Sequence, residues 1–109
     1  MGMDAKTDVW VGYDADKVFG RLPDEVVSQL ENRGDIEVDG VLIRDYFVSD
    51  ERVGLGVELL YHDWDYGLKE IDLDDLTKKA SALKSKVSQI FKGWGIDDEP
   101  KVLLASSFG

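Results

Sequence analysis

Cysteine is absent from this 109-residue chain, histidine occurs once and proline twice. The missing thiols exclude disulfides, thiolate zinc sites, iron–sulfur clusters and cysteine nucleophiles. A single imidazole cannot supply a two-histidine metal site, so we expect no metal and no cofactor. The apolar runs are far too short to span a membrane, and the first seven residues lack the apolar core of a signal peptide. We therefore expect a cytoplasmic protein that does not bind membranes.

Positive charge is also scarce, with 13 Lys and Arg against 23 Asp and Glu, for a formal net charge of −10. Residues 1–75 hold 20 of the 23 acidic residues but only 7 of the 13 basic ones. Such a balance repels nucleic acid and anionic membranes at long range and attracts basic partners. We therefore expect a protein partner, basic in character, rather than nucleic acid.

A strand, a helix and a hairpin are predicted in the first half of the chain. Residues 8–13 alternate in polarity and are rich in strand formers, and residues 14–17 are expected to form a turn. Residues 23–33 predict a short helix, because they begin with proline, which suits a first helical position, and Gly34 suits a left-handed end. The Asp-Gly pair at 39–40 lies between two apolar runs and indicates a hairpin with a type I′ turn.

Residues 53–61 alternate with period two, which is typical of a strand with one buried face. The side chains expected to face the core are Val53, Leu55, Val57, Leu59 and Tyr61. The opposite face is expected to carry Gly54, Gly56, Glu58, Leu60 and His62. The two glycines leave this second face bare, so they indicate a bulge or the close approach of another backbone.

A long helix is predicted over about residues 73–92. Asp72 suits its N-cap, and apolar residues recur along one side at alternating spacings of three and four. They are Leu73, Leu76, Ala80, Leu83, Val87, Ile90 and Trp94. We expect Leu76, Leu83 and Val87 to be buried.

The predicted order is strand, helix, three strands, helix, strand. The last strand, at residues 102–105, is apolar on both faces, which is typical of the centre of a sheet. We interpret residues 1–109 as one α+β domain. It should hold a small antiparallel or mixed sheet of 4–5 strands, with one short and one long helix packed mainly on one face. Residues 1–6 are expected to be a flexible N-terminal tail.

Residues able to do chemistry gather at His62-Asp63-Trp64-Asp65. An imidazole beside two carboxylates is a candidate metal-binding group or acid–base pair, so His62, Asp63 and Asp65 are the catalytic candidates. In a strand, however, His62 points away from both aspartates, and no second histidine completes a metal site. We interpret the segment as the polar end of a strand, without a metal.

The leading functional hypothesis is a non-catalytic protein-binding module of the inhibitor, immunity or adaptor type. If both helices cover one face of the sheet, the other face stays open, and exposed aromatics amid carboxylates are typical of binding hot spots. The residues expected on this surface are Trp10, Tyr46, Glu58, His62 and Trp64, with Phe47 replacing Tyr46 in the other register.

Three other interpretations remain open. Trp10 and Trp64 fit equally well as residues that close the ends of the core. One functional alternative is a small metal-dependent or acid–base enzyme centred on His62, Asp63 and Asp65. A further alternative is a structural subunit of a homo-oligomer, such as a homodimer.

Overall fold

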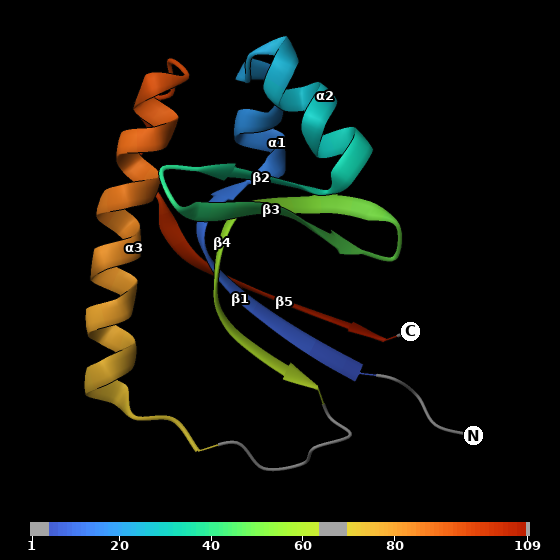
Figure 1. The fold of residues 1–109 in the computed structure, drawn as a ribbon. Coiled ribbons are helices and arrows are strands. Elements are labelled where there is room, and N and C mark those ends of the chain that lie inside the picture. The colour runs from blue at the N-terminus through green and yellow to red at the C-terminus, as the bar shows by residue number, and fades with distance from the viewer. Residues whose placement is uncertain (1–4, 64–69, 109) are drawn as a thin grey trace.

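The computed structural model describes residues 5–63 and 70–108, which form a five-stranded antiparallel sheet with three helices (Figure 1). The strands are β1 (Ala5–Asp14), β2 (Asp35–Val38), β3 (Val41–Val48), β4 (Glu51–Asp63) and β5 (Lys101–Phe108). The helices are α1 (Ala15–Val18), α2 (Asp24–Arg33) and α3 (Leu73–Gly93), and a 3-10 turn, η1, spans Phe19–Arg21. The strand order is β2-β3-β4-β1-β5. The α+β prediction is confirmed.

The chain enters the sheet earlier than the sequence predicts. β1 begins at Ala5, so the end of the predicted tail belongs to a strand. β1 ends where the Asp14 carboxylate accepts a hydrogen bond from the Asp16 amide at 3.0 Å and caps α1. The prediction of a turn at 14–17 is wrong. Val18 is fully buried, and its packing stabilises a one-turn helix that would be marginal in isolation.

The predictions for α2 and the β2–β3 hairpin are confirmed. α2 ends at Gly34, which has a φ of 77° and donates its N–H to the Leu30 carbonyl at 2.8 Å. Asp39 and Gly40 have φ values of 51° and 77°, as a type I′ turn requires. Both elements are specified by residues adjacent in sequence.

A β-bulge in β4 interrupts the predicted alternation. Val9 of β1 pairs with Leu60, but the next residue, Trp10, pairs with Glu58, so Leu59 is an extra residue. A bulge of this kind bends the strand and increases its twist. In Figure 1, β4 turns sharply along its length and leaves β3 to follow β1.

The bulge moves His62 away from Glu58. Beyond it, His62 lies on the same face of the sheet as Val9, which packs against the core. The prediction that Glu58, Leu60 and His62 share one face is therefore wrong, because one extra residue shifts the alternation by one position. Tyr61, predicted to face the core, is exposed on the opposite face.

α3 spans Leu73–Gly93, as predicted. The Asp72 carboxylate accepts hydrogen bonds from two backbone amides of the first turn, at 3.0 and 3.2 Å. Val87 is fully buried, whereas Leu76 and Leu83 are only half-buried. The C-terminal half of the helix is better packed, because Phe91, which lies outside the predicted stripe, contacts two other aromatic rings.

All three helices pack on one face of the sheet. Figure 1 shows α1 and α2 beside β2 and β3, and α3 alongside the part of β4 that follows β1. The core between helices and sheet consists of Val11, Tyr13, Val18, Leu22, Val26, Leu30, Val41, Ile43, Leu55, Leu59, Val87, Ile90, Phe91 and Ile96. No helix within the described ranges is long and apolar enough to cross a membrane.

β5 lies at the edge of the sheet, not at its centre as predicted, and pairs with β1. Val102 and Leu104 lie opposite Val11 and Val9 on the helix-bearing face, yet they are 55% and 65% exposed. The reason is that α3 packs against β1 and β4. A strand that is apolar on both faces is central only when other elements cover both faces.

Candidate functional site

Two glycines of β4 make room for an aromatic stack on the face of the sheet opposite the helices. A Cβ atom at Gly54 would lie 2.0 Å from Cζ2 of Trp10, and one at Gly56 would lie 2.8 Å from Cδ1. The indole therefore covers both glycines. It also stacks on the Tyr46 ring, with centroids 4.4 Å apart and an interplanar angle of 10°, and its Nε1–H donates to the Tyr13 carbonyl at 3.4 Å.

Two of the predicted surface residues are therefore buried. Trp10 is 3% exposed and Tyr46 is 5% exposed, so the expectation that they project from the open face is wrong. Glycine has no side chain, so large rings from the neighbouring strands fill the space above it. Neither ring belongs to the main core, and together they form a second, smaller cluster. Trp64 lies outside the described residues.

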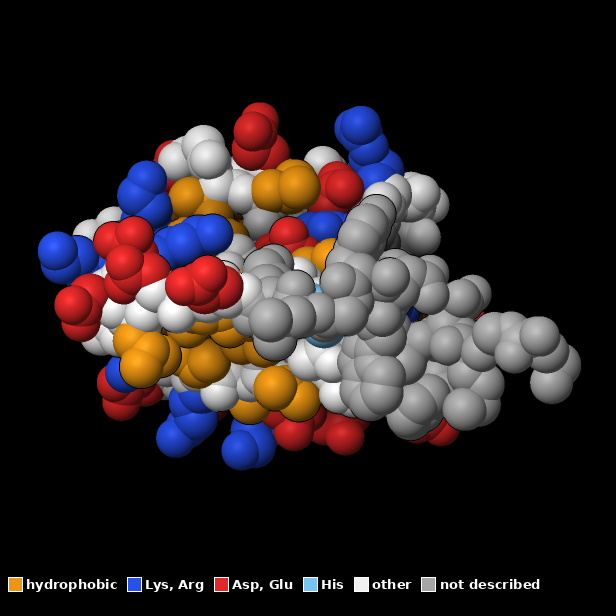
Figure 2. All heavy atoms as spheres, turned by 90° about the horizontal axis from the view of Figure 1, so that it is seen from below, with side chains coloured by type: hydrophobic (Ala, Val, Ile, Leu, Met, Phe, Trp, Pro, Cys, Tyr) orange, Lys and Arg blue, Asp and Glu red, His pale blue; other side chains and the backbone are white. Residues whose placement is uncertain are grey.

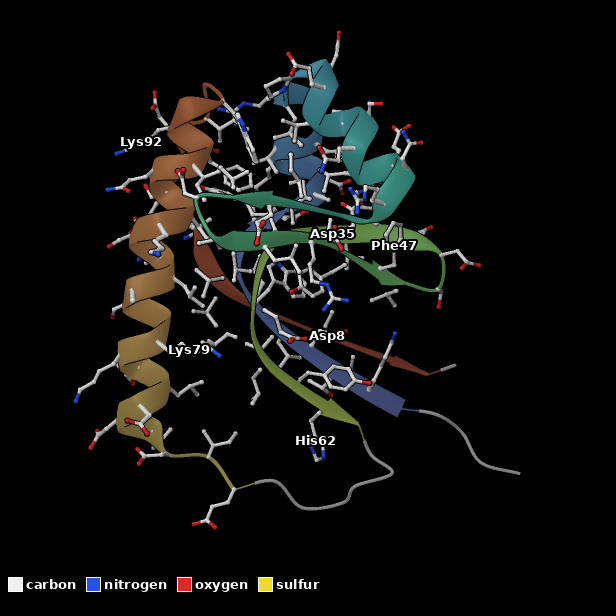
Figure 3. All side chains as sticks on the ribbon, viewed as in Figure 1. Asp8, Asp35, Phe47, His62, Lys79 and Lys92 are labelled. Atoms are coloured by element: carbon white, nitrogen blue, oxygen red, sulfur yellow. The ribbon has the colours of Figure 1, made fainter. Side chains whose placement is uncertain are left out.

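A cleft of about 390 Å³ opens beside this stack, and we call it the sheet cleft. Strands β1, β3 and β4 supply its lining, which consists of Lys6, Asp8, Arg44, Asp45, Tyr46, Phe47, Glu58 and Tyr61. No helix residue belongs to this lining in the part of the chain that the structure describes. Figure 3 shows Asp8 on β1 well apart from α3, whereas Lys79 extends from α3 toward β4.

The Tyr46 hydroxyl is buried and has no hydrogen-bond partner among the described residues. Its pKa is raised well above the usual tyrosine value, chiefly by burial and then by the Glu58 carboxylate. The phenol therefore stays protonated at physiological pH, with one O–H donor and two acceptor lone pairs. An unpaired buried hydroxyl costs about 1–3 kcal/mol, which a hydrogen bond from a ligand would offset.

Two carboxylates and two cations surround the hydroxyl. Arg44 and Glu58 approach to 3.8 Å and are both well exposed, so this ion pair contributes little. Within the described ranges, Asp8 makes no ion pair. Burial raises the pKa of Asp8 even though Lys6 pulls it down. Asp8 is therefore a partly desolvated carboxylate that makes no ion pair within the described ranges, although Lys6 and Arg44 act on it from nearby.

Arg52 supports one wall of the cleft. Its guanidinium donates to both carboxylate oxygens of Asp45, at 3.0 and 3.1 Å. It also lies 3.8 Å from the ring centroid of Phe19 and 5.3 Å from that of Phe47. The pKa of Asp45 is nevertheless raised, because burial outweighs the hydrogen bonds from Arg52. These contacts hold the Phe47 ring, which is 45% exposed, on the helix-bearing face next to η1, and the Phe47 residue borders the cleft from there.

The sequence identifies Tyr46 and Glu58 as site residues but misses Asp8, Arg44 and Tyr61. These three come together through pairing between strands. Asp8 pairs with Tyr61 across β1 and β4, and β3 places Arg44 opposite a glycine of β4. No local motif signals this, because it depends on the strand order and on the bulge.

The predicted His62 cluster is not part of the sheet cleft. His62 is half-buried and lies near the C-terminal end of β4, apart from Asp8 (Figure 3). The side chain of Asp63 and the whole of Asp65 fall outside the described residues, so the enzyme alternative stays a prediction. Among the residues that are described, no three His, Asp or Glu side chains are grouped to hold a metal ion.

Comparison of the chain with protein-family models, curated proteins and solved structures found no match. Functional inference therefore rests on the geometry of the sheet cleft. The cleft joins a protonated hydroxyl, the two carboxylates and two cations around it, and the exposed ring of Tyr61. Such an arrangement is suited to binding a polar, charged group beside an aromatic wall.

Proposed function

We propose that the chain is a non-catalytic protein-binding module of the inhibitor, immunity or adaptor type, and that it binds its partner at the sheet cleft. The observation that carries this proposal is the set of side chains around the cleft. Tyr61 is exposed beside charged groups on the same face as the buried stack of Trp10 and Tyr46, and the exposed Phe47 borders the cleft. Aromatic side chains on a rigid base lose little entropy on binding and are frequent hot spots.

The charge of the chain supports a basic protein partner. The net charge is −10, and the acidic residues are concentrated in residues 1–75, which include β1 to β4. This field attracts positively charged partners and opposes the phosphate contacts on which nucleic-acid binding depends. A cytoplasmic location belongs to the same proposal, because a chain without cysteine gains nothing from an oxidising compartment.

The proposal is tested with a photo-crosslinking amino acid at Phe47, and with a control probe at Ser85 on the exposed side of α3. We expect the Phe47 probe to capture a protein from the native source that the Ser85 probe does not capture. That protein, once purified, should bind the wild-type chain. Phe47→Ala and Tyr61→Ala should each raise Kd at least about tenfold, a loss of about 1.4 kcal/mol.

Ser85→Ala is the matched control and should leave Kd unchanged. Each variant is first checked for an unchanged melting temperature, so that a loss of binding is not a loss of folding. The proposal fails if every partner recovered binds equally well to the Phe47 and Tyr61 variants.

A second candidate, a structural subunit of a homodimer, is favoured by the open edge of β5. Figure 2 shows hydrophobic side chains exposed among charged groups on the underside of the molecule, and Val102 and Leu104 of β5 are exposed. Lys101 is the single charged residue of β5, so two copies would meet there without strong repulsion. Antiparallel pairing of two β5 strands is self-complementary and would continue the sheet.

Sedimentation analysis tests this second candidate. The wild-type chain should be a dimer, and Leu104→Asp should make it a monomer. Leu73→Asp introduces the same charge at an exposed apolar position of α3 and should remain dimeric. A monomeric wild-type chain at high micromolar concentration would exclude the homodimer.

A further inference from the structure

The chemistry of the sheet cleft is specific enough to indicate what kind of group binds in it. The Tyr46 side chain is only 5% exposed, and its hydroxyl has no hydrogen-bond partner within the described ranges. The charged groups that act most strongly on this hydroxyl are Glu58, Arg44 and Asp8, and all three line the cleft. An occupant of the cleft would therefore meet the Tyr46 phenol, two carboxylates and the Arg44 guanidinium together.

The field of the whole chain favours a cation in the cleft over an anion, since the lining itself balances Lys6 and Arg44 against Asp8 and Glu58. Asp45 is already neutralised by two hydrogen bonds from Arg52, which leaves Asp8 and Glu58 as available acceptors. Asp8 makes no ion pair among the described residues, and the nearest approach of Arg44 to Glu58 is a loose 3.8 Å. The field of a chain with net charge −10 further raises the local concentration of cations.

The shape of the donor and acceptor set favours a guanidinium over an ammonium. The acceptors are the carboxylates of Asp8 and Glu58 and the phenol oxygen of Tyr46. A guanidinium has five N–H donors in one plane, matches carboxylates in pairs and stacks on aromatic faces. Tyr61, which pairs with Asp8, supplies such a face in the lining of the cleft. The chain itself uses this contact nearby, where a guanidinium lies 3.8 Å from the centroid of a phenylalanine ring.

We propose that the sheet cleft is a subsite for one arginine side chain of the protein partner, with its guanidinium bound by Asp8 and Glu58 above the Tyr46 hydroxyl. This inference rests on the proposed function and deepens it, because it names the group that the partner must present. On binding, Arg44 moves out toward solvent and releases Glu58 to the incoming guanidinium. The chain would thus exchange a weak internal ion pair for a stronger one with its partner.

The test uses four small probes that differ in one side chain. They are the N-acetyl methylamides of arginine, lysine, citrulline and glutamate. Binding is followed by NMR on the labelled protein, through the Trp10 indole N–H and the amides of Gly54 and Gly56, which lie under the aromatic stack. We expect saturable shifts with the arginine probe. The citrulline probe, which has the same shape without the charge, should bind at least about tenfold more weakly, since hydrogen bonds to charged groups are about twice as strong.

Variants of the chain locate the binding groups. Asp8→Asn and Glu58→Gln should each raise Kd for the arginine probe about tenfold. Tyr46→Phe should raise it several-fold while the ring stack, and so the fold, is kept. Asp16→Asn removes the same charge from the exposed surface of α1 and should leave Kd unchanged, which controls for the overall field.

Several results would overturn the inference. Equal binding of the citrulline probe, or equal loss with Asp16→Asn, would show that no specific guanidinium site exists. Tighter binding of the lysine probe would replace the guanidinium by an ammonium. Binding of the glutamate probe alone would assign the cleft to an anion held by Lys6 and Arg44.

The outcome is separable from that of the proposed function. If no probe binds but a captured partner depends on Phe47 and Tyr61, the arginine subsite is wrong and the binding module stands. If the arginine probe binds but no partner depends on those two residues, the subsite stands and the binding module is wrong.

Discussion

Trp10 and Gly54 form a packing pair whose coupling we expect to be large. The three atoms nearest to a Cβ added at Gly54 all belong to Trp10, at 2.0 to 2.9 Å. Gly54→Ala should therefore destabilise the wild-type chain by about 1–3 kcal/mol, the usual effect of overpacking. Trp10→Ala alone should cost about 3–5 kcal/mol. Once the indole is removed, Gly54→Ala should instead stabilise by about 0.5–1 kcal/mol, because alanine loses less backbone entropy in a strand than glycine does.

Gly56 supplies the matched control for this cycle. A Cβ added there would lie 2.2 Å from the Val11 carbonyl oxygen, so Gly56→Ala should destabilise the chain with or without Trp10. Urea unfolding followed by circular dichroism measures each free energy of unfolding, with sodium sulfate added to keep the Trp10→Ala variants folded. The reasoning is refuted if Gly54→Ala costs the same in both backgrounds.

Three further outcomes are expected. Phe91→Ala should lower the free energy of unfolding in urea by about 3–5 kcal/mol, because the ring is fully buried. Leu73→Ala, at the exposed end of the same helix, should change the free energy of unfolding by no more than about 0.5 kcal/mol. Equal effects would contradict the packing of α3. Burial raises the pKa of Tyr13 to about 12, while an unfolded tyrosine ionises near 10. The Tyr13 contribution to stability should therefore be complete below pH 10 and be lost at about 1.4 kcal/mol per pH unit from 10 to 12, in addition to the loss from Tyr46, whose pKa is also raised. Tyr13→Phe should make the total fall shallower in denaturation curves recorded across this range. Dialysis against a chelator should leave the melting temperature unchanged, because one histidine and no cysteine cannot form a closed zinc site; a large drop would implicate the region around His62.

The elements that the sequence predicts well are those set by neighbouring residues. α3 follows from the capping carboxylate of Asp72 and a helical apolar stripe, and the hairpin follows from Asp39 and Gly40. Each depends on hydrogen bonds and backbone angles within a few residues. Such signals lie within a few consecutive residues, so they can be recognised without knowing how the strands pair.

The errors arise where distant strands decide the outcome. The bulge at Leu59 exists only in the pairing of β4 with β1, and it reverses the face on which His62 lies. Trp10 looks like a surface anchor until Gly54 is placed beneath it on the neighbouring strand. β5 is apolar enough for a central strand, but its position at the edge depends on the strand order of the whole sheet.

The same limit explains why the cleft was only partly predicted. Alternation along its own strand predicts the face of Glu58, whereas alternation along β3 leaves either Tyr46 or Phe47 on that face. Asp8 and Arg44 join them only because β1 and β3 both pair with β4. A single sequence does not reveal those partnerships, since period two alone leaves the choice of neighbouring strand undetermined.

The pairing of β1 with β5 has a consequence for the order in which the molecule assembles. Register pairs join Gly12 to Lys101 and Ala5 to Phe108, so about 90 to 100 residues of chain must be closed into a loop before these strands meet. The β2–β3–β4 meander needs only short turns, and local contacts form faster than distant ones. We expect β1 to dock late, between β4 and β5. Because β1 brings Asp8 to the cleft and Trp10 to its base, binding competence would then arise in the last step of folding and be the first property lost in unfolding.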